Sequence, residues 1–272
     1  MNDLLRELAP ISPEAWKEIE AEAKRTLKVT LAARRVVDFS GPLGWETSAI
    51  RLGRASVLKT PIGENVEARL RKTQPLVEFR TPFEISRTEI ETVARGSKDP
   101  DLESVTQAAR TAGLAEDRTV FHGYADAEIV GMFQAGTESA LTISDSYETY
   151  PGLVAEATNK LRSEGVDGPY AIALGPKCYT GLTKTTANGG YPIIKHVAAL
   201  LDGPIVWAPG VDGAVVLTLR GGDFELNAGE DFSIGYLEHS ATTVRLYIQE
   251  SFTFRVLSPE AVVPLTYTKK RG

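Results

Sequence analysis

Histidine and cysteine are the side chains most often used for metal binding and nucleophilic catalysis, and this 272-residue chain has few of them. His122, His196 and His239 lie far apart, and none belongs to a HExxH motif or a His/Cys cluster. Cys178 is the single cysteine, so a distant histidine would have to activate it, and no catalytic signature surrounds it. We predict no metal site, structural or surface roles for the histidines, and a half-buried, unreactive thiol.

Carboxylate pairs and glycine runs give no stronger sign of catalysis. Glu116-Asp117 and Glu230-Asp231 are adjacent along the chain, but general acid–base chemistry also requires a cleft and a shifted pKa. The sequence has no phosphate-binding GxxxxGKS/T motif, no GxGxxG motif after a strand and no GxSxG elbow. Gly189-Gly190 and Gly221-Gly222-Asp223 are explained as turns. These observations favour a protein that is not an enzyme.

Periodic apolar residues predict two long helices in the first half of the chain. Ser12 followed by Pro13 is typical of an N-cap and a first helical turn. The apolar residues that follow recur three or four apart on one face: Trp16, Ile19, Ala23, Leu27 and Leu31. A second helix is predicted from Asp99-Pro100 or Asp101 to about Val120, with Gly113 as a local weak point.

Helices and strands alternate in the second half. Helices are predicted at 153–161, 177–184 and 192–201, and strands at 170–174, 205–207, 214–219, 224–227, 243–248 and 252–257. Within one strand, Val244, Leu246 and Ile248 alternate with Arg245, Tyr247 and Gln249, which predicts a sheet with one buried face. The fold class is therefore α+β.

The segment from Ile50 to Phe83 has the pattern of a long hairpin-like arm around the turn-rich residues 60–65. An isolated two-stranded ribbon is marginally stable in water and exposes unpaired strand edges. The arm therefore needs a surface to lie against, and a neighbouring subunit of an assembly would supply one.

The charge of the chain argues against two classes of partner. A formal net charge of −6 disfavours binding to nucleic acid or to an anionic membrane, because both require basic surface. The basic residues Lys269, Lys270 and Arg271 are interpreted as a solvated tail. No window has the roughly 18 apolar residues of a membrane span, and the first ten residues lack a signal-peptide pattern. We expect a cytoplasmic protein.

Motifs along nearly the whole chain resemble those of encapsulin shell proteins, a family formerly described as linocin-type bacteriocins. The matching segments follow the family order: 8–11 (LAPI), 34–38 (RRVVD), 41–46 (GPLGWE), 95–96 (RG), 116–117 (ED), 121–123 (FHG), 165–170 (GVDGPY), 220–224 (RGGDF), 231–236 (DFSIGY) and 250–254 (ESFTF).

The resemblance implies the HK97-like major capsid fold of tailed bacteriophages. It places an N-terminal helix and arm at 1–47, an extended E-loop at 48–78, a discontinuous P-domain at 79–131 and 223–267, an A-domain at 132–222, and a basic tail at 268–272. By the same resemblance, the E-loop pairs with adjacent subunits.

The resemblance also implies a homo-oligomeric icosahedral shell, expected in the smallest class (T=1, about 60 subunits). The shell would enclose a cargo enzyme, either a ferritin-like protein for iron storage or a dye-decolorising peroxidase. The cargo would dock through a C-terminal targeting peptide on an apolar patch edged by charge. The family positions that match this patch are Leu31, Arg34, Val37, Asp38, Ile234 and Tyr236. The apolar members are equally explained as ordinary core residues.

A second implied site is the loop that lines the five-fold pore: Thr185, Thr186, Ala187, Asn188, Gly189, Gly190 and Tyr191. It has no charged side chain, which predicts a small neutral pore. Some family members bind flavin between a tryptophan and the pore-loop tyrosine; Tyr191 matches, but Thr88 replaces the tryptophan, so no flavin or other cofactor is expected.

Two alternatives remain at the level of sequence. The first is a viral capsid protein that packages nucleic acid, and the second is a bacteriocin or a protease that acts through Cys178.

Overall fold

The computed structural model describes residues 4–60, 62–187 and 189–268. Helix α1 (Pro13–Thr30) begins where the sequence predicts. The Ser12 hydroxyl accepts a hydrogen bond from the Ala15 N–H at 3.2 Å, so it caps the helix. The predicted stripe from Trp16 to Leu27 is buried, while Leu31, just past the last turn, is half-buried.

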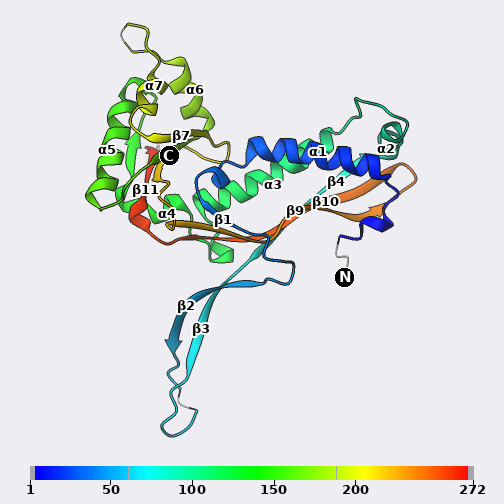
Figure 1. Cartoon of the computed structure of the whole chain (residues 1–272), viewed down its shortest axis with the longest axis horizontal. Helices are drawn as coiled ribbons and strands as arrows, with labels where there is room; N and C mark the ends of the chain where they lie inside the picture. Colours follow the sequence, from blue (N-terminus) through cyan, green and yellow to red (C-terminus); the bar gives the residue numbers. More distant parts are fainter. Residues whose placement is uncertain (1–3, 61, 188, 269–272) are drawn as a thin grey trace.

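Helix α3 (Glu103–His122) packs along α1, and the two helices cover one face of a sheet (Figure 1). Gly113, predicted as a weak point, is instead where the two helices approach each other. A Cβ atom on Gly113 would lie 3.0 Å from Cγ2 of Thr30 and 3.3 Å from Cδ2 of Leu27. The absence of a side chain permits the close contact, and the helix runs through without a break.

The first sheet has four strands in the order β1-β9-β10-β4. Their bounds are Asp38–Ser40 (β1), Phe224–His239 (β9), Thr243–Val256 (β10) and Val77–Ser86 (β4). Strands β9 and β10 are long and continuous, whereas the sequence predicted three short strands in their place. Tyr247 and Gln249, predicted to face solvent, are also buried, because both faces of β10 are covered along much of its length.

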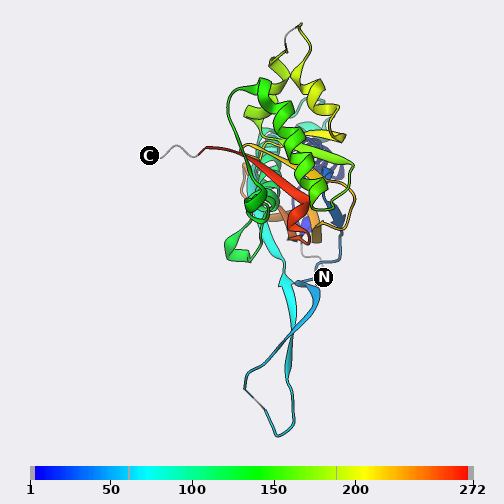
Figure 2. The same ribbon diagram turned by 90° about the vertical axis from the view of Figure 1, so that its left-hand side faces the viewer.

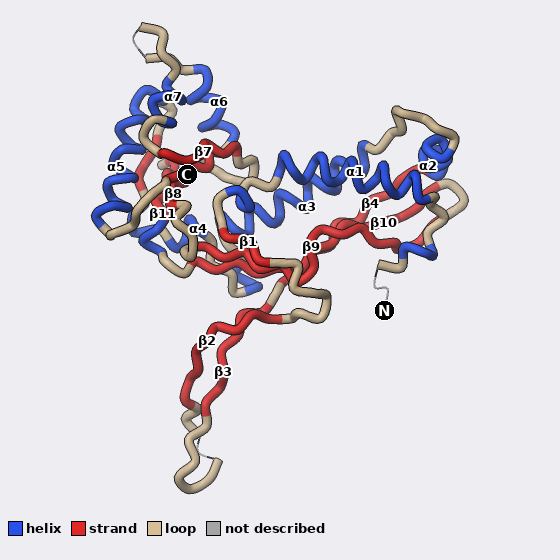
Figure 3. Tube along the Cα trace, in the orientation of Figure 1, coloured by secondary structure: helices blue, strands red, loops and turns tan. Residues whose placement is uncertain are grey.

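The second sheet has five strands in the order β5-β11-β8-β6-β7 and lies with four helices at the other end of the molecule (Figures 1 and 3). The strands are Leu141–Ile143 (β5), Val262–Tyr267 (β11), Ala214–Thr218 (β8), Tyr170–Leu174 (β6) and Asp202–Trp207 (β7). The helices are Met132–Ala135 (α4), Tyr150–Ser163 (α5), Pro176–Lys184 (α6) and Ile193–Ala198 (α7). Strand β11 pairs with β5 and β8 in this sheet.

Strands β2 (Ala49–Val57) and β3 (Arg69–Pro75) form a thin ribbon that projects far from the rest of the molecule (Figures 1 and 2). We call residues 49–75 the arm. It is shorter than predicted, because residues 77–86 leave the ribbon and form β4, where Phe83 is buried. Helix α2 (Arg87–Ala94) follows β4. No described residue of the arm belongs to the buried core.

Candidate functional site

A hollow of about 540 Å³ lies between α1 and β9, and we call it the α1–β9 groove. Its apolar surface comes from both elements and from β10: Ala23, Leu27, Leu31, Phe232, Ile234 and Ile248. Its polar edge contains seven further residues: Arg6, Glu20, Lys24, Lys28, Arg34, Asp231 and Ser233. Helical spacing brings the α1 residues to the groove on consecutive turns.

The groove combines three of the six residues expected to bind a peptide. Leu31, Arg34 and Ile234 line it. Val37 and Asp38 lie instead at a smaller hollow of about 210 Å³ beside Phe224, where the Asp38 carboxylate accepts a hydrogen bond from the Gly222 N–H at 2.6 Å.

Tyr236 also lies outside the groove. Its backbone N–H donates to the Leu4 carbonyl at 2.8 Å, and its hydroxyl lies 2.5 Å from Nδ1 of His239. The sequence did not identify Lys24, Leu27 and Lys28 as groove residues. Their spacing of seven, four and three residues from Leu31 was the signal that would have placed them on the same face.

Electrostatically, the edge of the groove is only partly neutralised. Arg6 pairs with Glu20 at 2.6 Å, and Arg34 pairs with Asp231 at 2.8 Å. Among the residues that the structure describes, Lys24 and Lys28 form no ion pair. The groove therefore presents an apolar surface beside an excess of positive charge.

Arg34 forms part of the groove wall, and contacts within the chain occupy its guanidinium group. Its Nε–H donates to Glu116 at 2.9–3.0 Å, and a terminal nitrogen contacts Glu116 at 2.5 Å and Glu250 at 3.5 Å. Its guanidinium also packs over the rings of Phe39 and Phe232, at 4.5 and 5.0 Å from their centres. Most of its donors are thus used within the chain.

Buried carboxylates surround this arginine. Asp117 is fully buried and accepts hydrogen bonds from the N–H groups of Ala32 and Ala33 at 2.9–3.1 Å. Burial raises the pKa of Asp117 to about 7, against the lowering effect of these two donors. Burial raises the pKa of Glu250 well above its ordinary value, and the nearby Glu116 raises it further. The positive charge of Arg34 opposes this rise in the pKa of Glu250.

We call the five-stranded sheet with helices α4 to α7 the second lobe. The predicted pore loop connects α6 to α7 at the tip of this lobe (Figure 1). The Ala187 N–H donates to the Tyr191 carbonyl at 2.8 Å, and the Gly190 N–H donates to the Ala187 carbonyl at 2.9 Å, so the loop closes on itself. Tyr191 is half exposed and meets His196 edge-on, with ring centres 4.6 Å apart. Asn188 lies outside the described residues.

Cys178 is fully buried, not half-buried as expected. Its sulfur lies 3.3 Å from the Tyr150 hydroxyl and 3.2 Å from the Tyr267 hydroxyl. Within the described ranges no imidazole hydrogen-bonds this thiol, so the arrangement gives no support to a cysteine nucleophile. His122 stacks on Phe133 with ring centres 4.6 Å apart, and burial lowers its pKa.

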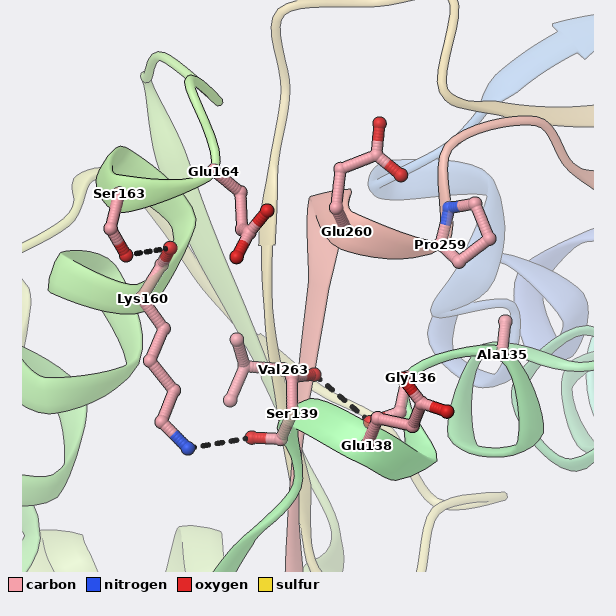
Figure 4. Close-up of a pocket in the computed structure, with 10 residues that line it drawn as sticks. All are labelled: Ala135, Gly136, Glu138, Ser139, Lys160, Ser163, Glu164, Pro259, Glu260 and Val263. Carbon is pink, nitrogen blue, oxygen red and sulfur yellow. Dashed lines mark hydrogen bonds between the residues drawn. The ribbon is translucent and has the colours of Figure 1, made fainter.

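Another hollow, also of about 540 Å³, lies between α5 and the turn at Pro259 (Figure 4). Lys160 extends into it and donates to the Ser139 carbonyl at 3.2 Å. Glu138, Glu164 and Glu260 border it, and none of the predicted site residues lies there. In the described part of the chain, no group of three His, Cys, Asp or Glu side chains is arranged to hold a metal ion.

The fold defines a class of protein. The structure resembles a virus-like particle from Pyrococcus furiosus (TM-score 0.66, 15% identity, covering 93% of this chain and 99% of that chain). It also resembles the capsid of an empty GTA particle (TM-score 0.56, 13% identity, covering 88% and 90%). The predicted α+β, HK97-like capsid fold is therefore confirmed.

Sequence comparison then defines the family. Residues 1–253 match a family model described as an encapsulating protein for peroxidase. A type 1 encapsulin shell protein of Rhodospirillum rubrum is 53% identical, covering 97% of this chain and 96% of the relative. One of Mycobacterium tuberculosis is 48% identical, covering 98% and 100%. The chain belongs to the encapsulin shell protein family. None of its described helices has the length and apolarity needed to cross a bilayer.

Proposed function

We propose that this chain is a structural subunit, and not an enzyme, that assembles with copies of itself into a closed icosahedral shell of the T=1 class, with about 60 copies. Membership of the encapsulin family, together with the capsid fold, supports this role. The projecting arm supports it too, because none of its described residues is buried in the subunit and a two-stranded ribbon requires a partner surface to be stable.

The shell encloses a cargo enzyme in the bacterial cytoplasm, and a C-terminal peptide of the cargo docks in the α1–β9 groove. The observation that carries this step is the groove itself: an apolar surface shared by α1 and β9, next to charged residues. A volume of about 540 Å³ is within the range of sites that hold several side chains of a ligand. The family description favours a peroxidase as cargo, with a ferritin-like protein as the alternative.

Leu31, Arg34 and Ile234 would contact the peptide directly or form the wall of its site. Val37, Asp38 and Tyr236 lie outside the groove in the isolated subunit. The loop 185–191 forms the neutral five-fold pore, through which ions and small substrates pass while the cargo is retained.

Substitution of Leu31 tests the docking site. Leu31→Asp puts a charge on the apolar surface of the groove, and we expect assembled particles that retain at least about tenfold less cargo, since burying an unpaired charge costs several kcal/mol. Val29→Asp is the matched control, because Val29 lies on α1 outside the groove and is 63% exposed.

The measurement uses a fluorescent protein fused to the C-terminal segment of a candidate cargo, either a peroxidase or a ferritin-like protein. Cargo per particle is read from fluorescence, and particle formation from electron microscopy. If Leu31→Asp particles retain as much cargo as Val29→Asp particles, the peptide binds elsewhere. If the unaltered protein forms no particles, the shell itself is disproved.

A further inference from the structure

The arm differs in charge from the rest of the molecule. Of the 30 Lys and Arg residues in the chain, six lie at 49–75, whereas only two of the 36 Asp and Glu residues do. The arm therefore has a formal charge of +4, and the remainder of the chain, with a total of −6, has a charge of −10. A strongly basic projection on an acidic body is an electrostatic feature that the subunit alone does not use.

The strand register places three arginines on one face of the arm. Arg51 is paired with Thr73, Ala55 with Arg71, and Val57 with Arg69. Side chains of paired residues point to the same face, and residues two apart along a strand share a face. Arg51, Arg69 and Arg71 therefore form a row along one face, which we call the arginine face.

On strand β3, the opposite face of the arm has a single basic side chain. Lys72 lies between Arg71 and Thr73 and thus points away from the arginine face, together with Ile50 and Leu70. Arg51, Arg71 and Lys72 are all exposed. Of the arginines, Arg69 is paired with Glu67 of the arm itself, whereas Arg51 and Arg71 have no ion pair among the described residues.

We propose that the arginine face of the arm docks on an acidic surface of a second copy of this chain, and that charge, in addition to shape, holds the arm in place. The inference rests on the proposed self-assembly and specifies its chemistry. A second copy is the occupant that the charges favour, since each subunit supplies both the +4 arm and the −10 body. Arginine suits this role because its planar guanidinium pairs with carboxylates through two hydrogen bonds.

The proposal predicts that assembly depends on salt. Exposed charges more than about 10 Å apart are screened at about 0.1 M salt, and the screening distance falls to about 3 Å at about 1 M. The protein concentration at which half of the subunits are in particles should therefore rise with ionic strength. An arm held by apolar contact alone would show the opposite trend or none, because salt does not weaken apolar burial.

Neighbouring residues of the arm provide a matched test. Arg71→Glu and Lys72→Glu make the same change in net charge, one residue apart, on opposite faces of the same strand. We expect Arg71→Glu to raise the half-assembly concentration by about tenfold or more, and Lys72→Glu to raise it by less than about threefold. The double variant Arg51→Glu/Arg71→Glu should form few particles.

Light scattering during size-exclusion chromatography measures assembly, and circular dichroism shows whether each variant is folded. The inference is overturned if the folded variants of Arg71 and Lys72 assemble equally well, or if salt does not change the assembly of the unaltered chain. In both cases the unaltered protein still forms particles, so the proposed shell would stand. Absence of particles from the unaltered protein would remove both proposals.

Discussion

Arg34 connects three parts of the chain that are far apart in sequence: the end of the N-terminal helix, α3 through Glu116, and the paired strands through Asp231 and Glu250. The sequence identified Arg34 as a peptide-binding residue only through family resemblance. It gave no role to Glu116-Asp117, because adjacency along the chain does not reveal burial. Both carboxylates are buried and need hydrogen-bond donors. Arg34 donates to Glu116, and the N–H groups of Ala32 and Ala33 donate to Asp117.

The pKa of Asp117 leads to a prediction about pH. In the folded chain this pKa is about 7, compared with an ordinary value of 3.8. Between these values the folded state holds a proton that the unfolded chain has lost. The stability contributed by this proton is thus complete below about pH 4 and is lost as the pH rises to about 7, a change of up to about 4 kcal/mol.

Asp117→Asn removes this titration. We expect its free energy of unfolding to fall less steeply between about pH 4 and about pH 7 than that of the unaltered chain, by up to about 1.4 kcal/mol per pH unit. Urea titrations at a fixed protein concentration measure the slope. Asp126→Asn, at an exposed position, should leave it unchanged. Equal slopes for the Asp117 and Asp126 variants would show that Asp117 is ionised throughout.

At the scale of elements, the sequence predicted the helices and the short buried strands better than the two longest strands. Helix α1 and strand β6 were predicted almost to the residue, because a cap or an unbroken apolar run marks them. The prediction ended β9 at residue 227 and divided β10 between residues 248 and 252, because polar residues such as Glu230 and Ser251 interrupt the apolar pattern. In the structure Glu230 accepts hydrogen bonds from Ser233 at 2.7 Å and Gln249 at 2.5 Å, and the Ser251 hydroxyl accepts one from the Glu230 N–H at 2.9 Å, so both Glu230 and Ser251 have partners inside the sheet.

The contact between α1 and α3 gives a prediction that opposes simple helix propensity. Alanine is favoured over glycine within a helix by about 1 kcal/mol. We nevertheless expect Gly113→Ala to destabilise the chain by about 1–2 kcal/mol, because its Cβ atom would press on Thr30 at 3.0 Å.

The control is Gly152→Ala in α5, where no atom lies within 4 Å of the added Cβ. This variant should be neutral or more stable, by up to about 1 kcal/mol. Thermal unfolding of the two variants under the same conditions makes the comparison. A Gly113→Ala protein as stable as the Gly152→Ala protein would mean that α1 shifts away at little cost.

At the scale of the whole molecule, the arm separates folding of the subunit from its assembly. Deletion of residues 58–69 removes the outer part of the arm and none of the buried core residues. We expect a folded protein with an unfolding free energy within about 1 kcal/mol of the unaltered chain, but one that no longer closes into particles. Circular dichroism tests whether the deletion variant is folded, and electron microscopy tests whether it forms particles.

Normal particles from the deletion variant would show that the arm is dispensable. The existence of a projecting ribbon could be predicted from the sequence, because turn residues flank its apolar runs. Its end could not, since residues 77–86 continue the same extended pattern and only their pairing with β10 shows that they belong to the body.

Strand β11 lies between β5 and β8, although it follows them by about 120 and about 45 residues in the chain. During translation, the gap between β5 and β8 stays open until the ribosome has released residues 262–267. A nascent subunit therefore has an incomplete second lobe while its basic ribbon is already outside the exit tunnel. Completion of this sheet therefore depends on pairing between segments far apart in the chain, a kind of contact that slows folding.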